Sequence, residues 1–127
     1  MAKKRMGARP TPGELDPIIH ERLRLGMLSA LVVQESMSFT ELRDLLQTTD
    51  GNLSVQARKL EAAGYVICDK RFVARKPKST YRLSAAGRTA LESYLETLSC
   101  MLPDLDKIRG ARTASLRAGI DPLPSHG

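Results

Sequence analysis

The sequence lacks the features that mark membrane-spanning, secreted and zinc-binding proteins. No apolar run approaches the roughly 20 residues of a membrane-spanning helix, and no hydrophobic stretch of the signal-peptide kind follows the basic segment 1–9. The two cysteines, Cys68 and Cys100, have no Cys or His at metal-ligand spacing. Two cysteines in a cytosolic chain usually stay reduced. We therefore expect a cytoplasmic protein that carries no metal and no cofactor.

Aromatic residues and catalytic constellations are also scarce. Only 4% of the 127 residues are aromatic, against 42% hydrophobic, which indicates one small domain with a modest core. A domain of this size buries roughly 60 to 65% of its unfolded surface and is marginally stable alone, so dimerisation would help. Catalysis needs convergent groups such as a nucleophile with its base or paired carboxylates. Neither His20, beside Glu21, nor His126 in the tail belongs to such a set, which disfavours an enzyme.

Positive charge is in excess and is concentrated in one segment. Eight basic and two acidic side chains lie between Asn52 and Arg82, a local charge of +6. The twelve basic and twelve acidic residues elsewhere cancel, so this segment accounts for the whole net charge of +6. Such a concentration favours a polyanionic partner. The alternative is an ordinary solvated face.

The chain divides into a basic flexible arm at 1–14, a folded domain at 15–102 and a tail at 103–127. The tail is expected to be disordered apart from a turn near 105–108. The arm either stays in solvent or enters the minor groove of DNA, as the basic arms of some DNA-binding domains do. Its candidate residues for that contact are Lys3, Lys4 and Arg5.

Regular structure is predicted to begin at Asp16, which can cap a helix with Pro17 at its first position. This helix is expected to run to about Gln34. Its apolar residues cover more than one face, and Gly26 would permit close approach of another helix. One stripe would pack on the domain's own core. The other either meets a second subunit or is buried within the same chain.

Two short helices joined by a tight turn follow. Ser38 and Glu41 form the Ser-x-x-Glu capping box of the first, with Met37 as its hydrophobic staple. Its predicted buried stripe is Leu42, Leu45 and Leu46. A polar turn at 47–51, with Thr49 or Asp50 as the cap, leads into the second short helix. The residues of that helix expected to point inward are Leu53, Ala57 and Leu60.

The outer side of this second helix has the residue types that read DNA. Asn pairs with adenine and Arg with guanine, Val can contact a thymine methyl group, and Ser can bond a base or a phosphate. The candidates are Asn52, Ser54, Val55, Arg58 and Lys59. Gln56 lies nearer the boundary of the buried stripe. Polar residues cover the outer face of most surface helices, so the set is informative only together with the turn and the hairpin that follows.

A basic hairpin is predicted after the helix stops at Gly64. Residues 65–68 have the composition of a strand, and residues 80–83 that of its antiparallel return. We expect the segment 71–78 between them to be a loop, because Pro77 discourages regular pairing. We call this hairpin the wing. Its candidate contacts to phosphates or to the minor groove of DNA are Arg75, Lys76 and Lys78. The alternative is a loop that only adds solubility.

Ser84 is predicted to cap a last helix whose apolar stripe runs past the small domain. A helix that extends beyond its own core needs another apolar surface, so we expect it to pair with the first helix across a two-fold axis. A ligand pocket against Leu98 and Met101 is the alternative. The predicted dimer-interface residues are Ile18, Leu25, Leu91, Tyr94, Leu95, Leu98, Met101 and Leu102.

These elements describe a mainly helical α+β fold: a winged helix-turn-helix with a two-stranded wing and a C-terminal dimerisation helix. The sequence resembles the winged-helix transcription regulators of the MarR and ArsR-like superfamily, especially compact single-domain members. The stretches TDGNLS at 49–54, KLEAAGYV at 59–66 and KSTYRLSAAGR at 78–88 carry the resemblance. It implies a homodimer on an inverted-repeat operator, with 52–59 in the major groove and 75–78 at the flank. The chain departs from the ArsR pattern in having no metal-sensing Cys/His cluster, and little helix extends beyond the domain to build an effector pocket.

The predicted function is therefore that of a sequence-specific regulator of transcription that binds double-stranded DNA as a homodimer. The competing interpretation is a winged-helix module that binds protein or RNA, because a fold does not fix a function. A steep fall of binding with added salt would fit a nucleic acid, and preference for a palindromic duplex would fit a specific regulator. The sequence indicates no particular small-molecule effector.

Overall fold

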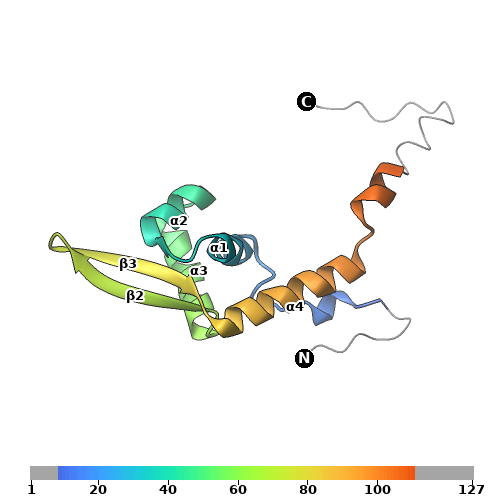
Figure 1. Cartoon of the computed structure of the whole chain (residues 1–127), viewed down its shortest axis with the longest axis horizontal. Helices are drawn as coiled ribbons and strands as arrows, with labels where there is room; N and C mark the ends of the chain where they lie inside the picture. The colour runs from blue at the N-terminus through green and yellow to red at the C-terminus, as the bar shows by residue number, and fades with distance from the viewer. Residues whose placement is uncertain (1–8, 111–127) are drawn as a thin grey trace.

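In the computed structural model, which describes residues 9–110, a helical body carries a β-hairpin at one end and a long helix at the other (Figure 1). In chain order the elements are η1 (Pro12–Glu14), α1 (Arg22–Val33), β1 (Met37–Ser38), α2 (Phe39–Leu46), α3 (Asp50–Ala62), β2 (Val66–Val73), β3 (Lys76–Leu83) and α4 (Ala85–Met101). The strands form one antiparallel sheet in the order β1-β3-β2. This confirms the predicted winged helix-turn-helix of the mainly helical α+β class.

The first helix begins later than the sequence predicts. Asp16 Oδ1 accepts a hydrogen bond from the Ile18 N–H at 2.8 Å, but a turn follows, and the N-cap of α1 is Glu21. The guanidinium of Arg24, only 8% exposed, donates to the carbonyl of Ile18 and, at 3.4 Å, to that of Pro17. The prediction of a helix starting at Asp16 is therefore wrong. The interruption is tolerated because a buried side chain bonds the carbonyl groups that a continuous helix would have used.

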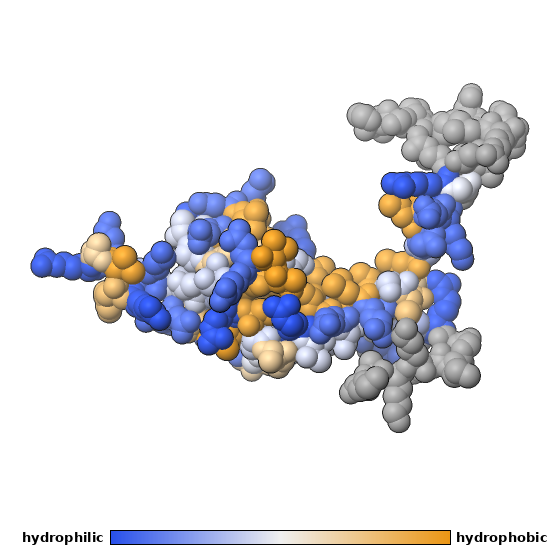
Figure 2. All heavy atoms as spheres, in the orientation of Figure 1, coloured by the Kyte–Doolittle hydropathy of each residue, from blue (hydrophilic) through white to orange (hydrophobic). Residues whose placement is uncertain are grey.

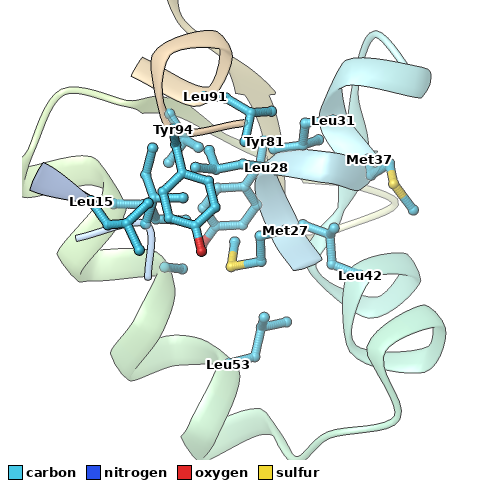
Figure 3. Packing of buried hydrophobic residues seen from close by; sticks show 14 residues of the cluster. Leu15, Met27, Leu28, Leu31, Met37, Leu42, Leu53, Tyr81, Leu91 and Tyr94 are labelled. Atoms are coloured by element: carbon cyan, nitrogen blue, oxygen red, sulfur yellow. The ribbon is translucent and has the colours of Figure 1, made fainter. Parts of the chain in front are cut away.

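The core lies where the helices meet the sheet (Figure 3). Met27, Leu28 and Leu31 of α1 are almost completely buried in a cluster to which α2, α3, the sheet and α4 all contribute. Leu91 and Tyr94 of α4 belong to this cluster and are 4% and 3% exposed. Their assignment to a dimer interface is therefore corrected, because the chain's own core already covers them.

The contact between α1 and α2 explains Gly26. A Cβ at this position would lie 2.9 Å from Cδ2 of Leu46, so the glycine lets α2 of the same chain approach α1. The buried side of α2 is centred on Leu42 and includes Leu46 and Phe39. Leu45 lies beyond the edge of that side and is 58% exposed, so its predicted burial is wrong.

The segment that begins at Arg9 contacts the end of α4. Arg9 donates a hydrogen bond to the carbonyl of Met101, so the N-terminal segment runs back to the far end of this helix. Residues 105–110 are helical, which extends the turn expected at 105–108. Lys3, Lys4, Arg5, His126 and the remainder of the tail lie outside the described residues. Within 9–110 no helix combines the length and the apolar character needed to cross a membrane.

Gly87 in the first turn of α4 lies directly against the backbone of Tyr65. A Cβ there would lie 2.0 Å from the carbonyl oxygen of Tyr65, which also accepts the Ser84 N–H at 3.1 Å. We predict that Gly87→Ala lowers the free energy of unfolding by about 2 to 3 kcal/mol, because backbone must move to admit the methyl group. Denaturant titration followed by circular dichroism measures the change.

The matched control is Gly51→Ala, since Gly51 is also helical but has no atom within 4 Å of the added Cβ. This variant should be as stable as the parent or up to about 1 kcal/mol more stable, because alanine favours the helix. Equal stability of the two variants would contradict the packing assigned to Gly87.

Candidate nucleic-acid interface

The helix-turn-helix begins at the capping box that the sequence predicts. Ser38 Oγ accepts the Glu41 N–H at 3.1 Å, and the Glu41 carboxylate accepts the Ser38 N–H at 2.8 Å. The bond from the Ser38 N–H to the carboxylate is the largest cause that lowers the pKa of Glu41, and the Ser38 side chain and the positive charge of Lys78 lower it further. Lys78 of the wing and Ser38 and Phe39 at the start of α2 line one groove, so the wing and α2 lie close together.

The turn between α2 and α3 is held from both sides. Gln47 ends α2 in the left-handed region with φ 51°. The Arg43 guanidinium reaches across the turn and donates to Asp50 Oδ1 at 2.8 Å, which raises the pKa of Arg43. Thr49 Oγ1 accepts the Asn52 N–H at 3.1 Å and is the N-cap of α3, one of the two caps that the sequence offered. The first turn of α3 therefore has a defined direction.

Helix α3 turns one side fully inward and leaves the other side open. Leu53 and Leu60 are 0% exposed and Ala57 is 1% exposed, which confirms the predicted buried stripe. On the remaining surface Asn52, Val55, Arg58 and Lys59 are exposed and Ser54 is half-buried. The sequence-predicted candidates on this helix thus share its free side.

The free side of α3 has two flanks. Residues four apart lie on one side of a helix, so Ser54 and Arg58 form one flank. Burial is the largest cause that raises the pKa of Tyr81 on β3, and the charge of Arg58 opposes this rise, so the flank with Arg58 is the one on the side of β3. Asn52 and Lys59 form the other flank, and Val55 lies between the two, opposite the buried stripe. Ser54 and Arg58 are therefore the α3 candidates that lie nearest the hairpin.

One hydrogen bond ties α3 to α1, and a second ties the strand side of the α3 end to the segment that precedes α1. Gln56 Oε1 accepts a hydrogen bond from the buried Arg24 guanidinium. Beyond the end of α3, after Gly64 with its φ of 78°, the Tyr65 hydroxyl donates to Asp16 Oδ2 at 2.5 Å. The position of α3 consequently depends on residues about 30 to 50 positions away in the sequence.

The wing is longer and more regular than predicted. β2 and β3 pair continuously from Val66 with Leu83 to Val73 with Lys76, so the expected loop at 71–78 is wrong. Only Ala74 and Arg75 form the turn, with φ 51° and 64°, the positive values that mirror-image hairpin turns require. Pro77 lies opposite Phe72 within this paired region. A proline without an N–H is tolerated there because β1 ends at Ser38 and leaves the outer edge of β3 unpaired.

Pairing places four of the wing cations on one face. Opposed residues of an antiparallel pair share a face, so Arg71 lies with Lys78, and Lys76 with Val73. Arg82 is on this face too and lies 3.7 Å from Asp69. Among the residues described, no acidic side chain forms an ion pair with Arg71, Lys76 or Lys78. Like charges directly opposite each other destabilise a sheet, so Arg71 and Lys78 favour an anionic partner.

An open groove of about 560 Å³ separates the start of α2 from β3. Hydroxyl and ammonium groups, the usual donors to phosphate oxygens, line part of it. They belong to Ser38, Thr40, Lys76, Lys78 and Ser79. The groove joins the helix-turn-helix to the wing, and its donors could follow a phosphate backbone.

Sequence reasoning missed several residues that build this surface. Arg71 lies in the charged window of the sequence but was assigned to a loop without a role. Thr40 and Ser79 had no signal, because isolated hydroxyl residues are common on surfaces. Arg24 could not be recognised either, since nothing local distinguishes a buried arginine from the exposed Arg22 two positions earlier.

In 9–110 no three His, Cys, Asp or Glu side chains cluster as metal ligands would.

Fold and surface together define a winged helix-turn-helix protein with its free α3 side and its basic wing at one end. The family profile of the winged helix DNA-binding domain matches residues 23–102. The uncharacterized protein MJ0432 of Methanocaldococcus jannaschii is 31% identical over 78 residues, which are 61% of this chain and 85% of the relative. The chain belongs to the winged helix DNA-binding domain family.

The family match confirms the winged-helix resemblance seen in the sequence, and solved structures of transcription regulators share the fold. A transcriptional regulator homologue of Pyrococcus horikoshii OT3 has 27% identity and a TM-score of 0.60 over 65% of this chain and 81% of its own. MepR of S. aureus, solved in complex with DNA, has 17% identity and a TM-score of 0.61 over 84% of this chain and 86% of its own. CouR, a transcriptional repressor bound to a 23-mer DNA duplex, has 19% identity and a TM-score of 0.61 over 80% of this chain and 73% of its own. At these two identities the likeness concerns the fold alone.

The bond from Tyr65 to Asp16 should make stability depend on pH. The hydrogen bond to Asp16, with burial and the Asp16 charge, raises the pKa of Tyr65 to about 12, from 10.0. A group whose folded pKa is raised stabilises the fold fully below its unfolded pKa and loses this contribution as pH rises through the folded value. We predict that Tyr65→Phe costs about 1 kcal/mol below pH 10 and that the difference narrows between pH 10 and 12.

Urea titrations of both proteins at several pH values test this. Other tyrosines titrate in both proteins, so only the difference between them is read. A difference that is constant from pH 8 to pH 12 would show that the bond to Asp16 does not form.

Proposed function

We propose that this protein is a sequence-specific regulator of transcription, not an enzyme, which binds double-stranded DNA in the cytoplasm as a homodimer on an inverted-repeat operator. The observation that carries the proposal is the free side of α3. Its Asn52, Val55, Arg58 and Lys59 are exposed while its other side is completely buried, and the wing, whose cations outnumber its one acidic residue, lies at the same end of the molecule.

The proposed division of labour follows from chemistry. α3 lies in the major groove, where Arg58 bonds guanine, Asn52 bonds adenine and Val55 contacts a thymine methyl group. Ser54 and Lys59 bond bases or phosphates at its margins. Arg75, Lys76 and Lys78 of the wing bond the neighbouring phosphates, which positions the protein without reading sequence. The groove beside α2 supports this arrangement, because its donors lie between the two elements.

The homodimer is proposed from the apolar surface that the chain leaves uncovered on α4. Leu95 and Leu102 are 50% and 54% exposed, and Leu98 and Met101 are half-buried. Ile18 and Leu25, also half-buried, would complete the interface from the first helical region. A two-fold axis through this surface would cover it on both subunits and give the symmetry of an inverted repeat.

Binding to protein or RNA in place of duplex DNA is the competing function. Selection from a random duplex pool, followed by titration of the selected duplex at increasing salt, separates the two. A regulator should enrich a palindromic sequence and lose affinity steeply with salt. Failure to enrich any duplex would refute the proposal.

Base reading and phosphate binding should respond differently to mutation. Arg58→Ala should cost about 1 to 3 kcal/mol on the selected duplex and relax its sequence preference, because one base contact is lost. Lys76→Ala should weaken all duplexes similarly and reduce the salt slope by about 1. The control is Arg88→Ala, which removes an exposed cation of α4 outside the proposed surface. Identical behaviour of Arg58→Ala and Lys76→Ala would contradict the assignment.

Assembly is tested on the exposed leucines of α4. Leu95→Glu and Leu102→Glu should yield folded monomers with weak binding to the palindromic duplex, because a carboxylate opposes burial of this surface. Leu45→Glu is the control, since Leu45 is equally exposed but lies on α2. Analytical ultracentrifugation gives the mass, and an unchanged dimer in both α4 variants would rule out this interface.

A further inference from the structure

Phe72 stands uncovered near the tip of the wing. Its side chain is 79% exposed, and the neighbouring Val73 is 53% exposed. Figure 2 shows apolar atoms at this tip beside strongly hydrophilic ones, away from the rest of the apolar surface. A large aromatic side chain in water gains nothing for the fold of the isolated chain. Phe72 is therefore accessible to a partner.

The register gives Phe72 a direction. Phe72 lies opposite Pro77, so the two rings share a face of the hairpin. Counting back by two residues, this is the face of Cys68 and Val66 on β2 and of Tyr81 on β3. Tyr81 and Val66 are buried in the same core cluster as Leu60 of α3. Phe72 and Pro77 thus continue, beyond the core, the sheet face that α3 packs against.

The charges around the tip select the kind of partner. Lys70 shares the face of Phe72, the turn contributes Arg75, and Arg71, Lys76 and Lys78 occupy the opposite face. An apolar protein surface would have to desolvate these cations in order to reach the ring. A DNA duplex presents phosphates to the cations and stacked bases behind them, so it complements both parts of the tip.

We propose that Phe72, backed by Pro77, enters the minor groove beside the segment that α3 occupies and wedges between two base pairs, kinking the duplex. Phe and Pro are both side chains that such wedges use. Pyrimidine–purine steps unstack most easily, so the wedge would add a preference for TA or CA steps at a position that no base-specific hydrogen bond reads. This inference rests on the proposed function and names one further specificity-determining residue.

The test uses the duplex selected by the full chain, with 2-aminopurine placed at the flanking step and a donor and acceptor dye at the two ends. The parent protein should raise the 2-aminopurine fluorescence and bring the ends closer. Phe72→Ala should abolish both signals and lower affinity about tenfold, which corresponds to about 1.4 kcal/mol. Its salt slope should stay unchanged, since no charge is lost. Phe72→Leu, which keeps an apolar wedge, should retain both signals and most of the affinity.

The melting temperature of Phe72→Ala should equal that of the parent, because the side chain is exposed. Unchanged affinity and unchanged fluorescence in Phe72→Ala, with binding still weakened by Lys76→Ala, would overturn the wedge and leave the proposed regulator intact. Absence of duplex binding by the parent would overturn both. Vesicles of anionic lipid are the last probe: Phe72-dependent binding to them, with duplex binding indifferent to Phe72, would assign the tip to a membrane surface and overturn the wedge.

Discussion

The seating of α3 on the core is the constraint on which the rest of the surface depends. A helix of 13 residues has one buried side, and Leu53, Ala57 and Leu60 fill it so completely that the direction of every other side chain is determined. A shift of one residue in this stripe would rotate the free side by about 100°. Burial of these three apolar side chains therefore leaves Asn52 and Arg58 exposed to a ligand.

A buried arginine adds a second, less expected constraint. Arg24 joins the carbonyls of Pro17 and Ile18 to Gln56 on α3, and Glu21 lies 4.0 Å from it. A buried guanidinium must keep its partners, because an unsatisfied charge in the interior is costly. Arg24 consequently links the segment before α1 to the middle of α3. A substitution that displaces this segment should therefore also displace α3.

Local signals made most of the fold predictable, and nonlocal contacts account for the errors. The capping box at Ser38, the α3 stripe and the stop at Gly64 each follow from a few adjacent residues, and all three are confirmed. The late start of α1 depends on Arg24, whose partners no local pattern reveals. The wing is longer than predicted because Pro77, the reason for expecting a loop, lies where the outer edge of β3 is free, and Ala74 and Arg75 lack the Asn-Gly composition that marks a two-residue turn. The stripe of α4 was recognised, but a stripe alone cannot show that Leu91 and Tyr94 face the chain's own core.

The arrangement along the long axis links assembly to recognition. α3 and the wing lie toward one end of the molecule, and the uncovered part of α4 extends toward the other (Figure 1). In the proposed dimer the two reading helices would thus lie away from the two-fold axis, and the path from one to the other would run through α4 and the core. The separation of the half-sites would then depend on how α4 is anchored at Gly87, Leu91 and Tyr94, residues that touch no DNA. Substitutions there should alter which spacing of half-sites is preferred, whereas substitutions on α3 should alter which bases are preferred.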